Sequence, residues 1–244
     1  MEQLWFTALL NHLFGGPVYA LLTALGVHID PRRAATPIPN SFAMEVLVAL
    51  LLLTFFFAVR LRLSVDDPGG LQHAIEWIET FFGSMGEEII GHHYHAYHSY
   101  IVILGLFILC CNLIGIIPSL ESPTAVPIVP LGCALLTWFY YHFQGLRANG
   151  IGYFKHFMGP VWWLAPLMLP IEIFSHCARV LSLTVRLFAN MFAGEMVTLV
   201  FFSLVPIGVP IIFEGLHIGV SLIQTYIFVI LACVYLGEAT AHEH

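Results

Sequence analysis

Long apolar runs dominate this chain, and their length restricts what it can fold into. A helix needs about 20 apolar residues to cross the hydrocarbon core of a bilayer, which is about 30 Å thick. Runs of about that length or longer follow one another, and we predict that they cross a membrane: 42–59, 99–117, 126–143, 161–205 and 211–236. We therefore predict an all-α polytopic membrane protein with about five membrane passes.

The composition argues against a soluble domain. Hydrophobic residues make up 59% of the chain and charged residues only 9%, whereas soluble domains carry about 25% charged residues. The spans leave little of the 244 residues for anything else. We expect one membrane domain with no soluble catalytic module, so the chain is not expected to be an enzyme by itself. The formal net charge of −7 argues against nucleic acid, which requires a basic face.

The N-terminal segment, residues 1–40, is predicted to lie outside the membrane or at its interface, and the membrane domain covers 41–244. Residues 1–27 are apolar, but the Gly15-Gly16-Pro17 turn interrupts them. This pattern favours a short interfacial helix or a partial insertion over a full span. Residues 28–40 hold three prolines, which is typical of an exposed loop.

Residues 71–95 have a different pattern from the spans. Apolar residues recur at spacings of three and four, with glutamates between them: Leu71, Ile75, Ile78 and Phe82. On a helix this spacing places the apolar side chains on one face and the carboxylates on the other. We predict an amphipathic helix that lies at the membrane interface and does not span.

The apolar stretch at 161–205 is about 45 residues long, which is too long for one helix perpendicular to the membrane. Either the stretch bends back as a re-entrant segment, or it forms one long and strongly tilted helix. Tilting normally accommodates only a modest excess of length. With the Pro206–Pro210 turn and the run at 211–236, we predict two long tilted helices that form a C-terminal hairpin.

The cations of the loops predict the orientation. With the predicted passes, four of them fall on one side of the membrane: Arg60, Arg62, Arg147 and Lys155. The positive-inside rule makes that side cytoplasmic, against Arg32 and Arg33 on the other side. We therefore place the N-terminus outside and the C-terminus in the cytoplasm.

Two arginines, Arg179 and Arg186, lie inside an apolar run. An arginine at mid-membrane costs from ~2.5 to more than ~10 kcal/mol, so it must face a partner or a water-filled cavity. One explanation is structural, with Arg186 paired to Glu195 or Glu172. The explanation that we favour is functional, with Arg186 meeting a mobile charge.

Helical spacing arranges the polar residues of this run into a stripe. Its members share one face of the helix: Glu172, Arg179, Ser182, Arg186 and Asn190. Glu195 lies nine residues beyond Arg186 and points to the opposite side. The last apolar run carries a second stripe, with spacings of three, four and three: Glu214, His217, Ser221 and Gln224. Two such stripes facing each other predict a wet path or a proton relay.

The run LSLTVRLFANMFAGE at 181–195 resembles the signature of the a subunit of F-type ATP synthases. The seven-residue spacing of His217 and Gln224, followed by Tyr-Leu, is similar to the last helix of that family. Asn112 and Pro118 around the end of the second span and GIGYF at 150–154 also fit. The resemblance covers about residues 40–240.

The resemblance implies a stator proton channel of a bacterial inner membrane, with two offset half-channels. Arg186 would face the essential carboxylate of the rotating c-ring, and four residues would line the aqueous paths: Asn190, Glu195, His217 and Gln224. Five others are candidate accessory residues: Glu172, Arg179, Ser182, Glu214 and Ser221. Arg179 is expected to face lipid and reach the interface. The implied partners are the c-ring, the b subunits of the peripheral stalk, lipid and protons, with no cofactor or metal.

Thirteen histidines keep a haem- or quinone-binding respiratory subunit open as an alternative, because bis-histidine haem sites are built between membrane helices. Only His176 and His217 lie deep in the apolar runs that would form such a site. A further group at the predicted interface would titrate there or bind a metal: His92, His93, His95 and His98. The five cysteines have no zinc or haem spacing. A secondary transporter is less favoured, since no internal repeat is visible. The coupling ion, H⁺ or Na⁺, is left open.

Overall fold

The computed structural model describes residues 3–26, 36–63, 69–91, 94–117, 120–153, 163, 165–205 and 208–241, and every regular element there is helical. Seven α-helices make up most of it: α1 (Trp5–Ala24), α2 (Asn40–Arg62), α3 (Gly70–Ile90), α4 (His98–Leu113), α5 (Ile128–Asn149), α7 (Ala165–Leu204) and α8 (Val209–Thr240). Short 3₁₀ turns join them: η2 (Tyr94–Ala96), η3 (Ile114–Ile116), η4 (Pro123–Ala125) and η5 (Gly150–Gly152). The predicted all-α fold is confirmed.

Four described helices are long and apolar enough to cross a membrane: Asn40–Leu61, His98–Ile116, Pro166–Leu204 and Val209–Thr240. They coincide with four of the five predicted spans, which confirms a polytopic membrane protein. The remaining predicted span corresponds to α5, which has 22 residues. The second half of α5 carries tyrosine, histidine and glutamine side chains and is less apolar than the other four. A fifth pass therefore stays a prediction.

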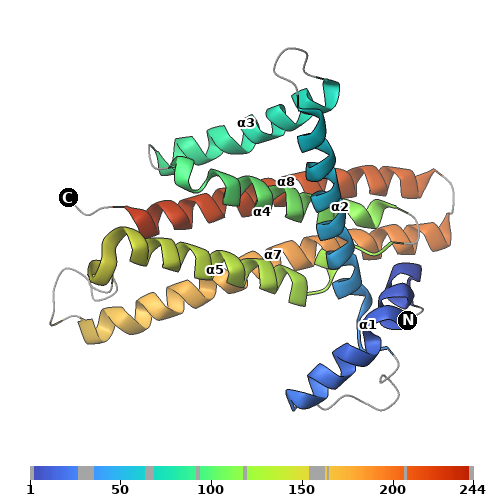
Figure 1. The fold of residues 1–244 in the computed structure, drawn as a ribbon, viewed down its shortest axis with the longest axis horizontal. Coiled ribbons are helices and arrows are strands. Elements are labelled where there is room, and N and C mark those ends of the chain that lie inside the picture. The colour runs from blue at the N-terminus through green and yellow to red at the C-terminus, as the bar shows by residue number, and fades with distance from the viewer. Residues whose placement is uncertain are drawn as a thin grey trace.

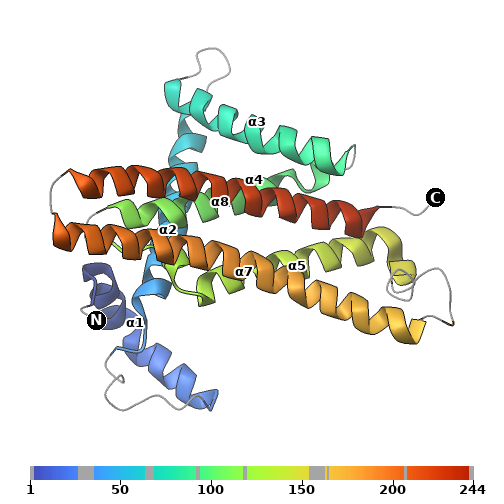
Figure 2. The same ribbon diagram turned by 180° about the vertical axis from the view of Figure 1, so that it is seen from behind.

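Helix α7 resolves the two alternatives for the long apolar stretch. It is one continuous helix of 40 residues that passes through Pro170, so the re-entrant bend is wrong. At 1.5 Å per residue it is ~60 Å long, about twice the thickness of a hydrocarbon core. Helix α8 returns antiparallel alongside it (Figures 1 and 2). A helix of this length stays within the core only if it is steeply tilted.

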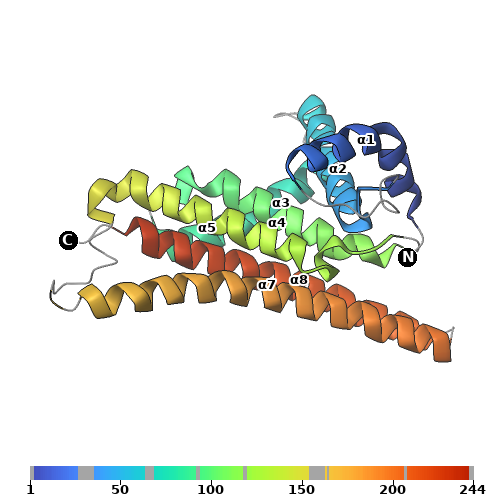
Figure 3. The same ribbon diagram turned by 90° about the horizontal axis from the view of Figure 1, so that it is seen from below.

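The hairpin of α7 and α8 forms one edge of the bundle (Figure 3). Helices α4 and α5 pack against it from one side, and α3 covers α4 and α8. Helix α2 crosses the common direction of these helices (Figure 1). A buried cluster holds α4, α5, α7 and α8 together, and its members include Ile108, Leu187, Met191 and Phe228. The long hairpin is thus supported along one face only.

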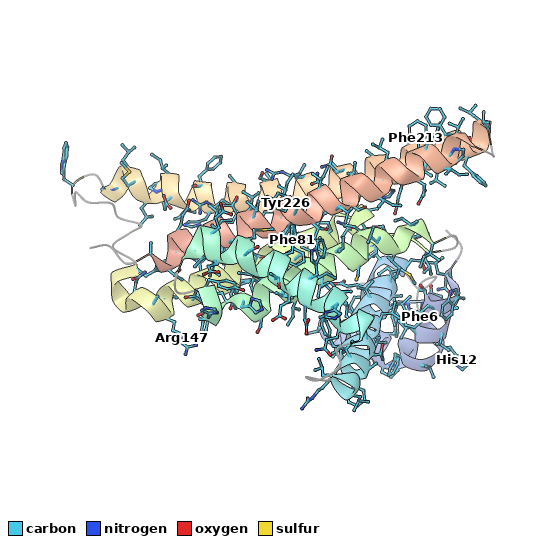
Figure 4. All side chains as sticks on the ribbon, turned by 90° about the horizontal axis from the view of Figure 1, so that it is seen from above. Phe6, His12, Phe81, Arg147, Phe213 and Tyr226 are labelled. Atoms are coloured by element: carbon cyan, nitrogen blue, oxygen red, sulfur yellow. The ribbon has the colours of Figure 1, made fainter. Side chains whose placement is uncertain are left out.

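Helix α3 carries the amphipathic pattern as predicted, but it ends before the predicted limit at residue 95. Gly91 adopts a positive φ of 78° and stops the helix, and Tyr94–Ala96 form a separate turn. Phe82 packs so closely on Gly105 of α4 that a β-carbon at Gly105 would lie 2.7 Å from its ring. Figure 4 shows Phe81 beside Tyr226 of α8, with ring centroids 6.2 Å apart.

The N-terminal segment contains a real helix, α1, which bends where the glycines and Pro17 interrupt it (Figure 3). The Asn11 amide both donates to the Ile38 carbonyl and accepts from the Ile38 N–H, at 3.1 and 3.0 Å. These bonds fasten α1 to the start of α2. Its placement outside the membrane or at the interface stays a prediction, and Arg32 and Arg33 lie outside the described residues.

Candidate functional site

Arg186 lies near the middle of α7, on the C-terminal side, and is half-buried. Its Nη2 donates to the Ser182 hydroxyl one turn earlier, at 3.3 Å. A small crevice brings Gln224 of α8 next to the guanidinium, with Leu183, Leu187 and Phe228 around them. Among the described residues no carboxylate lies within ion-pair distance of Arg186. The structural explanation, in which Arg186 pairs with Glu172 or Glu195, is therefore wrong.

The face of α7 that carries Arg186 borders an uncovered apolar surface. Leu181 and Phe192, on either side of it along the helix, are exposed by 63% and 43%. Other large apolar side chains of α7 are uncovered too, among them Phe174, Val185, Leu199 and Phe202. Because the rest of the bundle lies on one side of the hairpin (Figure 3), a partner of Arg186 can approach only from the open side.

Beyond Arg186 toward the C-terminal end of α7, Glu195 starts a chain of hydrogen bonds. Its Oε1 accepts the backbone N–H of Ser122, at 3.0 Å. The Ser122 hydroxyl lies 2.8 Å from that of Thr124. Thr124 in turn donates to Asn112 Oδ1 of α4, at 2.7 Å. Glu195 points away from Arg186 as predicted, toward the turn η4.

Asn112 continues this chain into α8. Its Nδ2 donates to the Thr225 hydroxyl at 3.2 Å and to the Ser221 carbonyl at 3.4 Å. The Ser221 hydroxyl donates to Met191 Sδ of α7, at 3.7 Å. Asn112 and Ser221 are fully buried, with no exposed surface. The result is a polar network of neutral groups that links Glu195 to α8 through the bundle, and we call it the Asn112 network.

His217 reaches the same region from α8. It is buried, and its ring packs against Gly194, where a β-carbon would lie 3.4 Å from the imidazole. Its buried Nε2 has no hydrogen-bond partner among the described residues. Within that part of the chain Glu195 bonds to Ser122 and not to His217. His217 therefore packs beside Gly194, the neighbour of Glu195 in the chain, without forming a direct hydrogen-bonded seam with Glu195.

The other residues of the two predicted stripes differ in how deeply they are buried. Gln224 is buried like His217 and Ser221, so the stripe of α8 does face α7. Glu214 and Asn190 are half-buried, and Ser182 is exposed.

Toward the N-terminal end of α7 the polar groups form pairs. Glu172 Oε1 lies 3.4 Å from His176 Nε2 on the next turn. Arg179 donates to Glu238 of α8 at 2.6 Å, and its guanidinium lies 4.7 Å from the centre of the Tyr235 ring. The expectation that Arg179 faces lipid is wrong, because a carboxylate and an aromatic face on α8 attract it inward.

The sequence reasoning missed several members of these groups: Ser122, Thr124, Tyr141 and Thr225. Ser122 and Thr124 belong to a segment that resembles an ordinary loop. Tyr141 and Thr225 are single hydroxyls in apolar helices, which are common and carry no signal of their own. The sequence shows Asn112 and His176 inside apolar runs but does not identify their partners. Glu172 four residues before His176 was the one local signal, because residues at that spacing meet on a helix.

Of the predicted histidine group, His92 and His93 lie outside the described residues. His98 bonds to the Tyr94 hydroxyl and, at 2.9 Å, to Glu79 of α3. Burial, together with Glu79 and Glu87, raises the pKa of the Tyr94 hydroxyl, which keeps it a proton donor. In the described part of the chain no three metal-ligating side chains gather at one point.

Fold and site together define a class of protein: a multi-pass helical membrane protein with a half-buried arginine at the uncovered side of a long helical hairpin. The family model described as ATP synthase A chain matches residues 42–237. ATP synthase subunit a of Koribacter versatilis is 63% identical over 244 residues, covering 100% of this chain and 99% of that one. The protein of the same name from Solibacter usitatus is 50% identical over 235 residues, covering 96% and 99%. The chain therefore belongs to the ATP synthase A chain family, which argues against the haem and quinone alternative.

Proposed function

We propose that this chain is the stator proton-channel subunit of a rotary F-type ATP synthase in a bacterial inner membrane. It would couple proton flow to ATP synthesis without catalysing a reaction itself. Family membership supports this proposal. The observation that carries it is Arg186, a half-buried cation with no described carboxylate partner, which borders the uncovered side of the hairpin.

Arg186 acts on the essential carboxylate of the c-ring. An opposite charge within about 4–6 Å lowers the pKa of a carboxyl group by about 1–3 units. A ring carboxyl that arrives protonated therefore gives up its proton when it meets the guanidinium. Because arginine keeps its charge at any physiological pH, it also blocks direct proton hopping from one half-channel to the other.

The two half-channels lie on opposite sides of Arg186 along α7. Glu195, nine residues away, and Glu172, fourteen residues away, are ~13 and ~21 Å from it along the helix axis. We assign His217, Gln224 and the Asn112 network to the same half-channel as Glu195. This spacing supports two paths that are offset along the hairpin and meet only at the ring.

The uncovered face of α7 is where the c-ring would bind. Its apolar side chains match the apolar surface of a ring of membrane helices, and α7 is long enough to follow a curved partner. The b subunits of the peripheral stalk would hold the chain from the other side of the bundle.

The orientation is supported by a cation at one end of the bundle, Arg147 in the last turn of α5. Arg147 projects away from the bundle at the end of α5 (Figure 4). The C-terminus and the start of α7 lie at the same end (Figure 2). We place this end in the cytoplasm, which puts the N-terminus and the Glu195 side outside.

Replacement of Arg186 tests the proposal. We expect Arg186→Ala and Arg186→Lys to reduce ATP-driven proton pumping by inverted membrane vesicles to below about a tenth of wild type, in an assembled complex. Lysine fails because it lacks the planar fork and loses its proton more readily when buried. Arg179→Gln is the matched control, since it removes an arginine from the same helix. Pumping by Arg186→Ala above that level would refute the assignment.

A further inference from the structure

A second buried imidazole of the hairpin, that of His176, is held by groups from two helices. It is 8% exposed. Its Nδ1 lies 2.8 Å from the Tyr141 hydroxyl of α5, and Tyr141 is 2% exposed. On the other side of the ring, Nε2 lies 3.4 Å from Glu172 Oε1. The imidazole therefore connects a buried phenol to a carboxylate that is a third exposed.

We propose that His176 is a proton-transfer residue of the half-channel at the N-terminal end of α7, with Tyr141 as its positioning residue. The inference rests on the proposed function and adds a residue to it. An ionised Glu172 can only accept, so the neutral imidazole carries its proton on Nε2 and its Nδ1 accepts from the Tyr141 hydroxyl. A proton that reaches the Glu172–His176 pair changes its charge from −1 to 0. The proton leaves through the exposed carboxylate, which restores the charge of −1.

The position of the pair suits this task. His176 lies ten residues before Arg186, which is ~15 Å along the helix, on the side opposite Glu195. Arg179 lies three residues beyond His176, and its pairing with Glu238 at 2.6 Å offsets a charge that would otherwise repel a passing proton. A proton that leaves Arg186 toward this end therefore meets the pair before the end of α7.

The surroundings of His176 leave room for a mobile base. A pocket of about 300 Å³ lies between α5 and α7, and it is lined in part by His142, Tyr153, His176 and Cys177. The His142 ring lies 4.7 Å from that of His176 and bonds to the Tyr153 hydroxyl at 2.7 Å. His142, Tyr153 and His176 therefore lie next to one another, and their ring carbons border an apolar pocket. A small base such as imidazole can enter this space when the His176 side chain is removed.

The test measures proton conduction through the membrane sector, purified as a complex and reconstituted in liposomes. A potassium diffusion potential with valinomycin drives protons inward, and a potassium electrode records the potassium that leaves in exchange. This readout counts charge, so added imidazole does not distort it by buffering. We expect His176→Ala to conduct at least about tenfold more slowly than wild type, and imidazole to restore most of the loss in the variant while leaving wild type unchanged.

Tyr141→Phe and Tyr100→Phe form a matched pair. Each removes one phenol that bonds across helices, since the Tyr100 hydroxyl donates to Thr137 of α5 at 3.0 Å. We expect Tyr141→Phe to slow conduction about threefold, because the imidazole loses its fixed tautomer, and Tyr100→Phe to conduct like wild type. His176→Gln keeps a hydrogen-bonding side chain for assembly but carries no proton, so it is expected to conduct as slowly as His176→Ala.

Conduction by His176→Gln within twofold of wild type would overturn the inference. So would a loss in assembled His176→Ala that imidazole does not reverse, because a purely structural hydrogen bond between α5 and α7 is not replaced by a free base. Failure of the broader proposal is visible separately. In that case the wild-type sector conducts no protons, or Arg186→Ala pumps normally, whatever His176 does.

Discussion

The two halves of α7 on either side of Arg186 belong to one helix but build different polar surroundings. On the C-terminal side, the Asn112 network joins neutral hydroxyl and amide groups from α4, η4 and α8 to one carboxylate, Glu195. On the N-terminal side, charged or titratable groups pair with each other, as in Glu172–His176 and Arg179–Glu238. Neutral groups stabilise a proton or water in transit without holding it, whereas pairs store charge at fixed places. The two half-channels that we propose therefore differ in chemistry.

Among the changes that test this difference between the two halves, breaking the Asn112 network is expected to cause the largest loss of stability and pumping. Asn112→Leu keeps the approximate size of the side chain but removes the acceptor of the Thr124 hydroxyl and the amide that donates to α8. Each buried polar group that loses its partner costs about 1–3 kcal/mol. We expect a clear drop in the thermal stability of the assembled sector and at least a fivefold loss of ATP-driven pumping, on the order of 1 kcal/mol of transition free energy.

Asn149→Leu is the control for Asn112→Leu. The Asn149 amide also donates to α8, to the Ala239 carbonyl at 3.2 Å, but it lies in a partly exposed place at the other end of the bundle. We expect this variant to pump like wild type. Equal losses in both variants would mean that any amide bond to α8 matters, and the network would have no special role.

A test of water access distinguishes a hydrated channel from a dry contact between helices. We expect it to change pumping less than Asn112→Leu does. In a complex that lacks the native cysteines, single cysteines replace Glu195, His217 and Gln224. If the Glu195 side is hydrated, a small water-soluble thiol reagent labels all three positions, and labelling reduces pumping. A cysteine at Ala134 of α5, which is buried in the apolar core at 0% exposure, is the control and stays unlabelled. Complexes in which all four positions stay inert would refute a hydrated path on this side.

The ion pair of Arg179 and Glu238 is expected to contribute least. Their side chains are 23% and 53% exposed. Exposed ion pairs contribute about 0–1 kcal/mol to the stability of a protein. We expect Arg179→Gln, Glu238→Gln and the double variant to lower stability by less than about 1 kcal/mol and to pump within twofold of wild type. A double-mutant cycle from melting curves gives the coupling. If Arg179→Gln abolished pumping as Arg186→Ala does, the polar stripe would act as one unit.

The sequence by itself determined the features that depend on local composition and spacing. Four of the five predicted spans appear as long apolar helices, because a run of apolar residues identifies a span without knowledge of its neighbours. The helical period placed His217, Ser221 and Gln224 on one face and Glu195 opposite Arg186 for the same reason. The amphipathic pattern of α3 was visible too, but the backbone of Gly91, and not the pattern, decided where the helix ends.

Only the tertiary structure decided which polar groups meet. Whether the stretch at 161–205 bends or continues depends on the helices packed along it, and hydropathy is the same in both cases. Arg179 turns toward Glu238, 59 residues away in the chain, since the rotation of α7 against α8 brings the two together. Ser122 and Thr124 enter the Asn112 network because the η4 turn folds onto α7. A hydrogen bond across a bundle is set by the packing of distant segments, and no local pattern encodes it.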